Sequence, residues 1–334
     1  MNILPTHTPA LFDVAVARAA DVLRAGGLVA LPTETVYGLA ANALDARAVG
    51  RIFAAKGRPA NNPIIVHVAD VEMARRCASR WPAAAESLGR AFWPGALTLV
   101  VPRASEVPDA VTAGGETVGI RWPSHPLIQA VIRACGFPLA APSANRSGEI
   151  SPTNAAHVRK SLGEAAALII DGGQSQIGIE STVIDVSGDR PRLLRPGMIG
   201  VAAVEAVLGL GALEMAPGRA GVLRSPGLLE KHYAPKAKLL VWRWRTEEEL
   251  ALRAGKLGVP HAAIHIVAHR VIPLHEKFGG VSVIPHDVEA FGRALYGELH
   301  ACDEAGAQII VVEAPPDEAG WEAICDRLKR ASSD

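Results

Sequence analysis

The 334-residue chain is short of several features, and each shortage excludes a class of protein. Its four cysteines stand far apart without a Cys-x-x-Cys pair, which argues against a disulfide framework or a cysteine zinc site. Lys plus Arg and Asp plus Glu both number 34, so no net charge holds the chain against nucleic acid or an anionic membrane. No apolar run approaches the roughly 18 residues of a membrane span, and no basic segment precedes an apolar one near Met1. We therefore expect a cytoplasmic protein without stable nucleic-acid or membrane binding.

Common nucleotide and metal motifs are also missing. There is no Gly-x-x-x-x-Gly-Lys-Ser/Thr loop, and Gly209-Leu210-Gly211 lacks the third glycine and the preceding strand of a dinucleotide fingerprint. His261, His265 and His269 recur every four residues, but no glutamate follows them in the His-Glu-x-x-His manner, and the residues between them favour a strand. We expect neither a Walker or Rossmann nucleotide site nor a metal site made of protein ligands.

What is present indicates an α/β protein, because 49% of the residues are hydrophobic and only 20% are charged. An apolar stripe between Thr8-Pro9 and Gly26-Gly27 predicts a first helix, and 45–55 predicts another. Short apolar runs predict strands at 28–31, 64–68, 97–101, 117–121, 139–141, 168–170, 182–186 and 193–194. Several of these strands are too close in sequence for a helical crossover, so we expect a mixed sheet.

The pattern changes near residue 209 to Gly, Pro and basic residues, which predicts a linker. His232 and Tyr233 near its end place an imidazole and a phenol where a passive tether needs neither. Beyond it, strands are predicted at 239–242, 262–267, 281–284 and 308–313, and helices at 247–254, at 288–300 and in a last stretch to 329. The chain is thus expected to contain a first domain over 1–208, a linker over 209–237 and a smaller α/β domain over 238–334.

Polar segments bounded by Gly or Pro follow the predicted strands of the first domain, where α/β proteins usually place their chemistry. After the first strand, Thr33, Thr35 and Tyr37 are expected to converge on a small polar ligand. Arg121 ends an apolar strand and must meet a carboxylate or a phosphate, because a buried unpaired charge is costly. Further on, four polar side chains in nine residues predict a phosphate or ribose cradle; they are Ser143, Asn145, Ser147 and Ser151. The set predicts an anion-binding active site.

Each segment also has a structural explanation. Thr33 and Thr35 suit an ordinary strand-to-loop turn. Lys56 and Arg58 follow a predicted helix and can complement its dipole. His67 lies in an apolar run, where a histidine is more often a satisfied core residue. Taken singly, the segments leave both interpretations open.

In this order, the segments PTETVYGLA, KGRP, NNPIIVHV, WPGALTLV, VGIRWP, PLAAPSANRSG, IGIESTVID and LLRPG resemble the YrdC-like threonylcarbamoyl-AMP synthase family. SPGLLEKHYAP before a small α/β domain resembles its two-domain form. The resemblance implies a YrdC-like open twisted mixed sheet with flanking helices around a concave cavity, and a smaller Rossmann-like C-terminal domain. It also implies condensation of L-threonine, bicarbonate and ATP to threonylcarbamoyl-AMP and pyrophosphate, with Mg²⁺ on the phosphates. The product would pass to threonylcarbamoyl-transferase machinery that modifies the tRNA adenosine next to the anticodon.

The resemblance also implies roles for individual residues. Threonine or its carbamate would be held by Thr35, Lys56, His67, Arg121 and Ser181, and by the backbone at Ala141, where many relatives carry a threonine. ATP would be held by Arg58, Asn62, Thr117, Ser143, Asn145, Ser151 and Arg195, with Tyr233 of the linker closing over the nucleotide as a lid that excludes water. Lys56, Arg58 and Arg121 would be the catalytic cations, since nucleotidyl transfer depends mainly on positioning and charge. Asp326 stands where an asparagine is expected, which leaves the role of the second domain open.

Two other functions remain open on the sequence alone. The same cationic site could serve an RNA-binding module, although the neutral overall charge argues against it. Carbamoyl transfer from carbamoyl phosphate is the other, and the chain shows no acylphosphatase-like or zinc-finger segment to accompany it.

Overall fold

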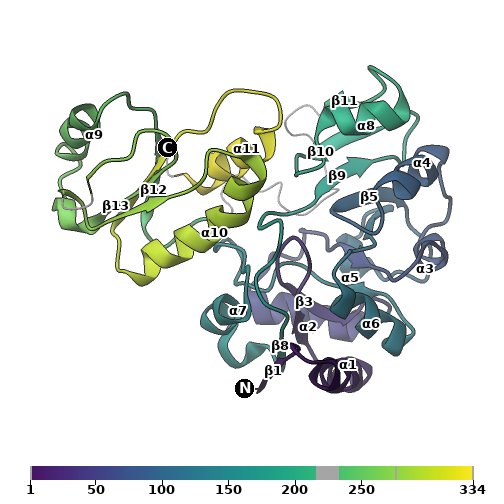
Figure 1. Cartoon of the computed structure of the whole chain (residues 1–334). Coiled ribbons are helices and arrows are strands. Elements are labelled where there is room, and N and C mark those ends of the chain that lie inside the picture. The colour runs from purple at the N-terminus through teal and green to yellow at the C-terminus, as the bar shows by residue number, and fades with distance from the viewer. Residues whose placement is uncertain (1, 216–232, 275–276, 333–334) are drawn as a thin grey trace. The chain divides into compact units, whose positions relative to one another are not determined.

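The computed structural model describes residues 2–215, 233–274 and 277–332 (Figure 1). The chain forms two compact units. The first unit consists of Met1–Ser147 and Ser151–Leu228, and the second of Gly148–Ile150 and Leu229–Asp334. Each unit has its own β-sheet among the described residues.

The first unit is built on an 11-stranded sheet within the part of the chain that the structure describes, in the order β1-β8-β2-β3-β7-β4-β6-β5-β9-β10-β11. Its strands are β1 (Asn2–Pro5), β2 (Val29–Leu31), β3 (Gly38–Asn42), β4 (Val66–His67), β5 (Leu97–Pro102), β6 (Thr117–Arg121), β7 (Leu139–Ala140), β8 (Leu168–Asp171), β9 (Thr182–Asp185), β10 (Arg192–Arg195) and β11 (Glu214–Met215). Strand β6 runs parallel to β4 and antiparallel to β5. The mixed sheet expected from the short connections is confirmed.

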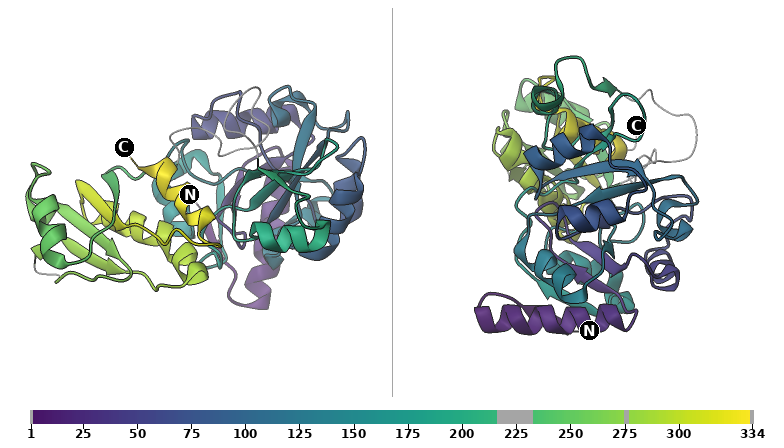
Figure 2. Two further views of the ribbon diagram at one scale, coloured as in Figure 1. Left: turned by 90° about the horizontal axis from the view of Figure 1, so that it is seen from above. Right: turned by 90° about the vertical axis from the view of Figure 1, so that its right-hand side faces the viewer.

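Helices pack on both faces of this sheet. They are α1 (Pro9–Arg24), α2 (Ala46–Lys56), α3 (Val71–Arg76), α4 (Ala83–Phe92), α5 (Asp109–Thr112), α6 (Pro126–Cys135), α7 (Ala155–Leu162) and α8 (Val201–Leu208). Successive residues of β2 point to opposite faces, so Val29 and Leu31 join a core with α1 and α6, whereas Ala30 joins the core that contains α2, α4 and α8. In both views of Figure 2, α1 (purple) lies at the periphery of the first unit.

Local capping explains where the predicted helices begin and end. The Thr8 hydroxyl accepts a hydrogen bond from the Leu11 N–H at the start of α1. The Asp45 carboxylate caps α2 in the same way, and Gly57 ends this helix in the left-handed conformation with φ of 59°. The sharp turn at Gly57 directs the chain from α2 towards Arg58.

The second unit contains a four-stranded sheet, among the described residues, in the order β12-β15-β13-β14. Its strands are β12 (Lys238–Trp242), β13 (Ile264–Ala268), β14 (Gly280–Val283) and β15 (Ile309–Glu313), and its helices are α9 (Glu247–Ala254), α10 (Val288–Glu304) and α11 (Glu322–Ala331). All paired strands run parallel, and every residue of the two central strands, β15 and β13, is buried. The predicted smaller α/β unit with a Rossmann-like parallel sheet is therefore confirmed.

Some features differ from the sequence prediction or lie beyond it. Strand β3 was missed because its residues are Gly, Leu, Ala, Ala and Asn, which have little intrinsic strand preference. His261 lies in a 3-10 turn and His269 beyond the end of β13, so the spaced histidines do not share one strand. Part of the predicted linker, including His232, lies outside the described residues. No helix in the described ranges is long and apolar enough to cross a membrane.

Candidate active site

The polar segment after β2 forms a tight turn that leads into β3. The Thr33 hydroxyl donates to the Val36 carbonyl oxygen at 2.6 Å and accepts from the backbone N–H groups of Thr35 and Val36. The expectation that Tyr37 joins the two threonines is wrong: its hydroxyl donates to the Gly173 carbonyl oxygen at 2.7 Å, at the start of a segment whose Ser175 hydroxyl donates to the Thr33 carbonyl oxygen. The ordinary-turn interpretation therefore applies to Thr33, whose hydroxyl only holds the turn together. The Thr35 hydroxyl is the one that contacts a residue outside the turn.

That partner is Arg121 at the end of β6. Its Nη1 donates to the Thr35 Oγ1 at 2.8 Å, its Nε donates to the Gly95 carbonyl oxygen at 3.2 Å, and its Nη2 lies 2.6 Å from the Glu34 Oε1. Because the single Thr33 hydroxyl proton goes to a carbonyl oxygen, the Thr35 hydroxyl donates to Thr33 across the 2.8 Å that separates them. The carboxylate that the sequence required for Arg121 is thus Glu34, and both side chains are only 4% exposed.

His67 lies directly beside this ion pair. In the parallel pairing of β4 with β6, His67 is the register partner of Arg121. Burial, followed by the nearby positive charge of Arg121, lowers the pKa of His67 to about 3. Its Nδ1 is buried and has no hydrogen-bond partner among the described residues. A neutral imidazole with an unused nitrogen therefore borders the Arg121–Glu34 pair.

The Glu34 carboxyl group remains ionised in this environment. Burial raises the pKa of Glu34, but the charge of Arg121 and hydrogen bonds from Arg121 and the Ser124 backbone outweigh burial, and the pKa lies below its usual 4.5. The cluster thus contains one buried anion, one buried cation and one neutral imidazole.

Lys56 connects the end of α2 to the loop that follows β7. Its Nζ donates to the carbonyl oxygens of Ser143, at 2.5 Å, and of Asn145, and lies 3.4 Å from the Asn145 Oδ1. In return, the Ser147 N–H donates to the Lys56 carbonyl oxygen at 2.8 Å. Dipole complementarity alone does not account for a lysine that is 3% exposed and directed at one loop. The loop that was predicted as a phosphate or ribose cradle therefore lies against the predicted cation, Lys56.

Arg58 and Asn62 lie in the turn between α2 and β4. Arg58 donates through Nε to the Asn62 carbonyl oxygen at 3.0 Å and through Nη2 to the Pro63 carbonyl oxygen at 2.7 Å. The Asn62 side chain is fully buried, and neither atom of its amide has a hydrogen-bond partner in the described parts of the chain. An unsatisfied buried polar group costs about 1–3 kcal/mol, so this amide is a candidate contact for a ligand.

Ser181 and Arg195 form a further cluster at β9 and β10. The Arg195 Nη2 donates to the Ser181 carbonyl oxygen at 3.0 Å and to its hydroxyl at 3.2 Å, and the Thr98 hydroxyl lies 2.8 Å from that of Ser181. Gly197 allows this approach, because a Cβ at this position would lie 2.3 Å from the Thr182 backbone nitrogen. Ser151 donates to the Glu180 carboxylate at 2.6 Å, next to Ser181.

The remaining predicted residues differ in their surroundings. Thr117 shares the face of β6 on which Arg121 lies, since the two are four residues apart in one strand. The Ala141 N–H already donates to the Ile65 carbonyl oxygen, so a backbone contact to a ligand has to use another Ala141 atom. Tyr233 belongs to the second unit, where its ring lies 5.9 Å from that of Tyr296 and beneath the Arg327 guanidinium.

Three polar residues of these clusters were missed from the sequence: Glu34, Thr98 and Glu180. The available signal was weak for Thr98, which lies in an apolar strand. For the two glutamates the signal was stronger, because each is a charge inside a segment of apolar and hydroxyl residues.

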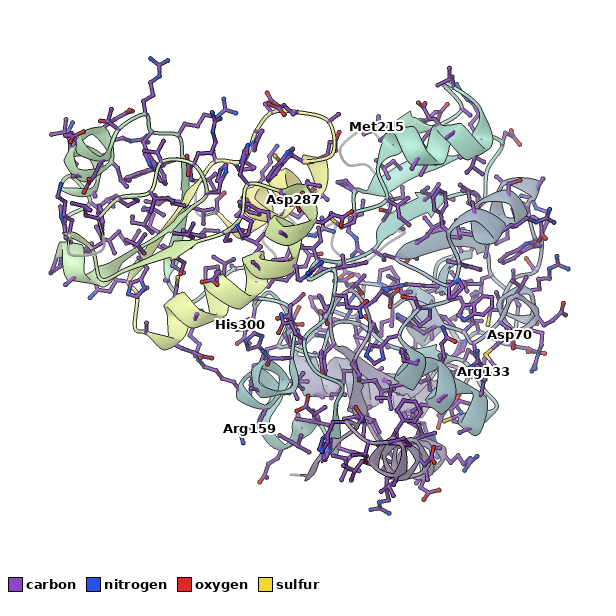
Figure 3. All side chains as sticks on the ribbon, viewed as in Figure 1. Asp70, Arg133, Arg159, Met215, Asp287 and His300 are labelled. Carbon is purple, nitrogen blue, oxygen red and sulfur yellow. The ribbon has the colours of Figure 1, made fainter. Side chains whose placement is uncertain are left out.

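The cations of the first unit fall into two groups. Arg133 and Arg159 extend from α6 and α7 at the surface, where Figure 3 labels them. Lys56, Arg58, Arg121 and Arg195 are instead at most 8% exposed and accompany buried hydroxyls and amides. Such a site can bind and stabilise a transferring phosphate by charge and position. The mixed α/β fold and this site define a nucleotidyl-transfer type of enzyme.

Comparison with known proteins gives the particular family. A family model described as "Telomere recombination" matches residues 21–197, and one described as "Threonylcarbamoyl-AMP synthase, C-terminal domain" matches residues 199–333. The chain belongs to the threonylcarbamoyl-AMP synthase family. The resemblance drawn from the ordered motifs is therefore confirmed.

Curated relatives and solved structures agree with this assignment. The threonylcarbamoyl-AMP synthase of Bacillus subtilis is 40% identical over 339 residues, covering 96% of this chain and 93% of that protein. The crystal structure of Pyrococcus abyssi Sua5 complexed with L-threonine matches with a TM-score of 0.90 and 37% identity, covering 99% of this chain and 97% of that one. A putative threonylcarbamoyl-AMP synthase of Mycobacterium tuberculosis is 38% identical over 200 residues, which cover 60% of this chain and 92% of that protein.

Proposed function

We propose that this chain condenses L-threonine, bicarbonate and ATP to threonylcarbamoyl-AMP and pyrophosphate. The product would supply the threonylcarbamoyl group for the tRNA adenosine next to the anticodon, through a downstream transferase. The observation that carries the proposal is the buried cluster of Arg121, Glu34 and His67, in a chain that resembles the threonine-bound P. abyssi protein over nearly its whole length.

We assign the threonine-binding role to one set of residues: Thr35, Lys56, His67, Arg121, Ala141 and Ser181. The fork of the Arg121 guanidinium suits a carboxylate, which it can bind bidentately. The unused His67 Nδ1 supports the assignment, because the buried neutral imidazole gains a partner when a polar substrate binds.

We assign the ATP-binding role to a second set: Arg58, Asn62, Thr117, Ser143, Asn145, Ser151, Arg195 and Tyr233. The unsatisfied Asn62 amide is the strongest support, since an amide can pair with a nucleobase or a phosphate at little cost. The buried guanidinium groups of Arg58 and Arg195 suit a triphosphate. Tyr233 is assigned as the lid by resemblance, and its left-handed backbone, with φ of 65°, is a strained conformation of the kind found at moving segments.

Mg²⁺ is proposed to enter with the triphosphate. Within the described residues there is no group of three or more His, Cys, Asp or Glu side chains placed to hold a metal ion. The two buried carboxylates of the site already contact Arg121 and Ser151. Mg²⁺ usually keeps several water ligands and binds through substrate phosphates, so this residue set fits a metal carried by ATP. Bicarbonate would supply the carbamate carbon.

The domain roles follow from the same proposal. We assign catalysis to residues 1–208, the linker and lid to 209–237, and a second domain to 238–334. A cytoplasmic location is supported by the four cysteines, all of which are free thiols.

Pyrophosphate release tests the proposal. Purified protein is given ATP and Mg²⁺ with L-threonine and bicarbonate, each omitted in turn, and the adenylate is detected by mass. Release that needs both substrates, with the mass of threonylcarbamoyl-AMP, is expected. Release without threonine would overturn the proposal; activity with carbamoyl phosphate would then favour carbamoyl transfer, and salt-dependent RNA binding without turnover would favour an RNA-binding module.

A further inference from the structure

We propose that Glu34 binds the α-ammonium group of the substrate and thereby restricts the site to α-amino acids. The inference rests on the function proposed above, because it concerns the threonine half of that site. None of the roles assigned so far uses Glu34, although it is 3% exposed and lies between Thr33 and Thr35 in the first polar segment.

The first argument is the position of the Glu34 carboxylate. Its Oε1 lies 2.6 Å from the Arg121 Nη2. Its contacts are with Arg121 and the Ser124 backbone, and neither the Oε1 nor the Oε2 has a hydrogen bond of good geometry among the described residues. A buried carboxylate normally accepts several hydrogen bonds. Glu34 therefore has acceptor capacity to spare at the residue that would bind the threonine carboxylate.

The second argument is the balance of charge. Without substrate, Arg121 and Glu34 neutralise each other, and His67, whose pKa is about 3, is uncharged at neutral pH. When the threonine carboxylate binds Arg121, two anions contact one guanidinium in a buried environment, which is unfavourable, and the Lys56 ammonium already donates to the Ser143 and Asn145 carbonyl oxygens. The threonine ammonium restores the balance if it lies against Glu34. A zwitterion thus fits this cluster, and an anion without an ammonium group does not.

The third argument concerns the alternative that Glu34 deprotonates the amine. Despite its burial, the pKa of Glu34 is held below 4.5, chiefly by the charge of Arg121, so its carboxylate is a weak base. A weak base in contact with an ammonium group binds and orients that group. Glu34 is accordingly a binding and specificity residue in this proposal, and proton removal is left to another group.

The test compares two ligands that differ only at the α-position. Isothermal titration calorimetry measures the Kd of L-threonine and of the 2,3-dihydroxybutanoate of matching configuration, in which a hydroxyl replaces the ammonium group. Both are titrated into the full-length protein and into Glu34→Gln, Glu34→Asp and Asp185→Asn. Asp185 is a matched control, because it is a buried carboxylate that accepts from the Ser187 N–H and hydroxyl.

The proposal predicts that the unmodified protein prefers threonine, and that Glu34→Gln weakens threonine binding about 10- to 100-fold while analogue binding changes little. Glu34→Asp, which keeps the charge, should retain part of the preference for threonine over the analogue. This variant provides the test if Glu34→Gln does not fold. Asp185→Asn should keep the full preference.

Other results overturn the proposal in distinguishable ways. If threonine and the analogue lose affinity equally in Glu34→Gln, Glu34 only positions Arg121, and the inference alone fails. If the unmodified protein binds the two ligands equally, the ammonium group is not recognised. The inference alone then fails, and no variant is needed to show it. If the unmodified protein binds no threonine, the proposed function fails together with the inference.

Discussion

The Lys56 ammonium nitrogen lies 2.5 Å from the carbonyl oxygen of Ser143, which is 87 residues further along the chain. Lys56 ends α2, and Ser143 lies in the loop after β7. Because the Ser147 N–H also donates to the Lys56 carbonyl oxygen, helix and loop are joined at two points. One cation thus determines the position of the loop to which ATP binding is assigned.

Replacing Lys56 with methionine should impair both folding and catalysis. The Ser143 and Asn145 carbonyl oxygens would lose a charged donor, which should lower the free energy of unfolding by about 2 kcal/mol. We expect kcat/KM for pyrophosphate release to fall about 100-fold or more, since a preorganised cation is lost. Arg47→Met, at an exposed position of the same helix, is the control and should keep both values. Wild-type kinetics in Lys56→Met would mean that the lysine only supports the loop.

Gly197→Ala should disturb the contact between Arg195 and Ser181. The added Cβ would lie 2.3 Å from the Thr182 backbone nitrogen and 2.7 Å from the Ser181 carbonyl carbon, so the segment after β10 has to move away from the start of β9. We expect a loss of about 1–3 kcal/mol of stability by calorimetry and weaker ATP binding by titration. Gly200→Ala is the matched control, because a Cβ there meets nothing within 4 Å. Equal effects of the two substitutions would contradict the close packing described at Gly197.

His67 should make the stability of the protein depend on pH. Its pKa is about 3 in the folded protein and 6.5 in its ordinary state, so between these values only the unfolded chain binds the proton. Stability should therefore fall as the pH drops from about 6.5 towards 3, by at most about 1.4 kcal/mol per pH unit. The lowered pKa of Glu34 adds a loss in the same direction below about 4.5.

Urea denaturation at pH 7, 6, 5 and 4 measures this dependence. Between pH 6 and 4, His67→Gln should lose stability with a shallower slope than the wild type, and His7→Gln, at an exposed position, should keep the wild-type slope. Identical slopes for the wild type and His67→Gln would show that His67 is not held neutral by burial.

Ending the chain after Met215 should impair turnover without unfolding the first unit. The cut retains α8, whose Val204 is fully buried in the core, and β11, which pairs with β10. Steady-state kinetics should show slower turnover, because the proposed lid at Tyr233 is removed. A cut after Gly200 is the contrasting variant, and it should lose stability because Val204 and β11 are removed. Unchanged kcat and KM after the cut at Met215 would show that the linker does not contribute to turnover and only connects the two units.

Local elements could be predicted well from the sequence. Strand β6 and helix α9 occupy the predicted ranges 117–121 and 247–254, because a short apolar run in one case and a Thr246 N-cap with an acidic first turn in the other are strong local signals. Strand β3 gave no such signal, because its small residues become a strand only between β2 and β7. Its strand conformation thus depends on pairing with neighbours that are distant in the sequence.

The candidate site was predicted only in part. Arg121 was expected to meet an anion, because a buried guanidinium requires one. That the anion is Glu34, and that Tyr37 turns away to Gly173, depends on side-chain directions within a turn, which residue types alone do not determine.

The sequence by itself determined the α/β class, part of the elements and the kinds of chemical group available, because periodicity, caps and residue types are local properties. Only the tertiary structure decided which groups meet. Lys56 with Ser143, and Arg121 with Glu34, are joined across chain separations that no local pattern records. Their contacts arise because segments distant in the sequence become neighbours around one sheet, where burial lowers the pKa of His67 and the charge of Arg121 keeps Glu34 ionised.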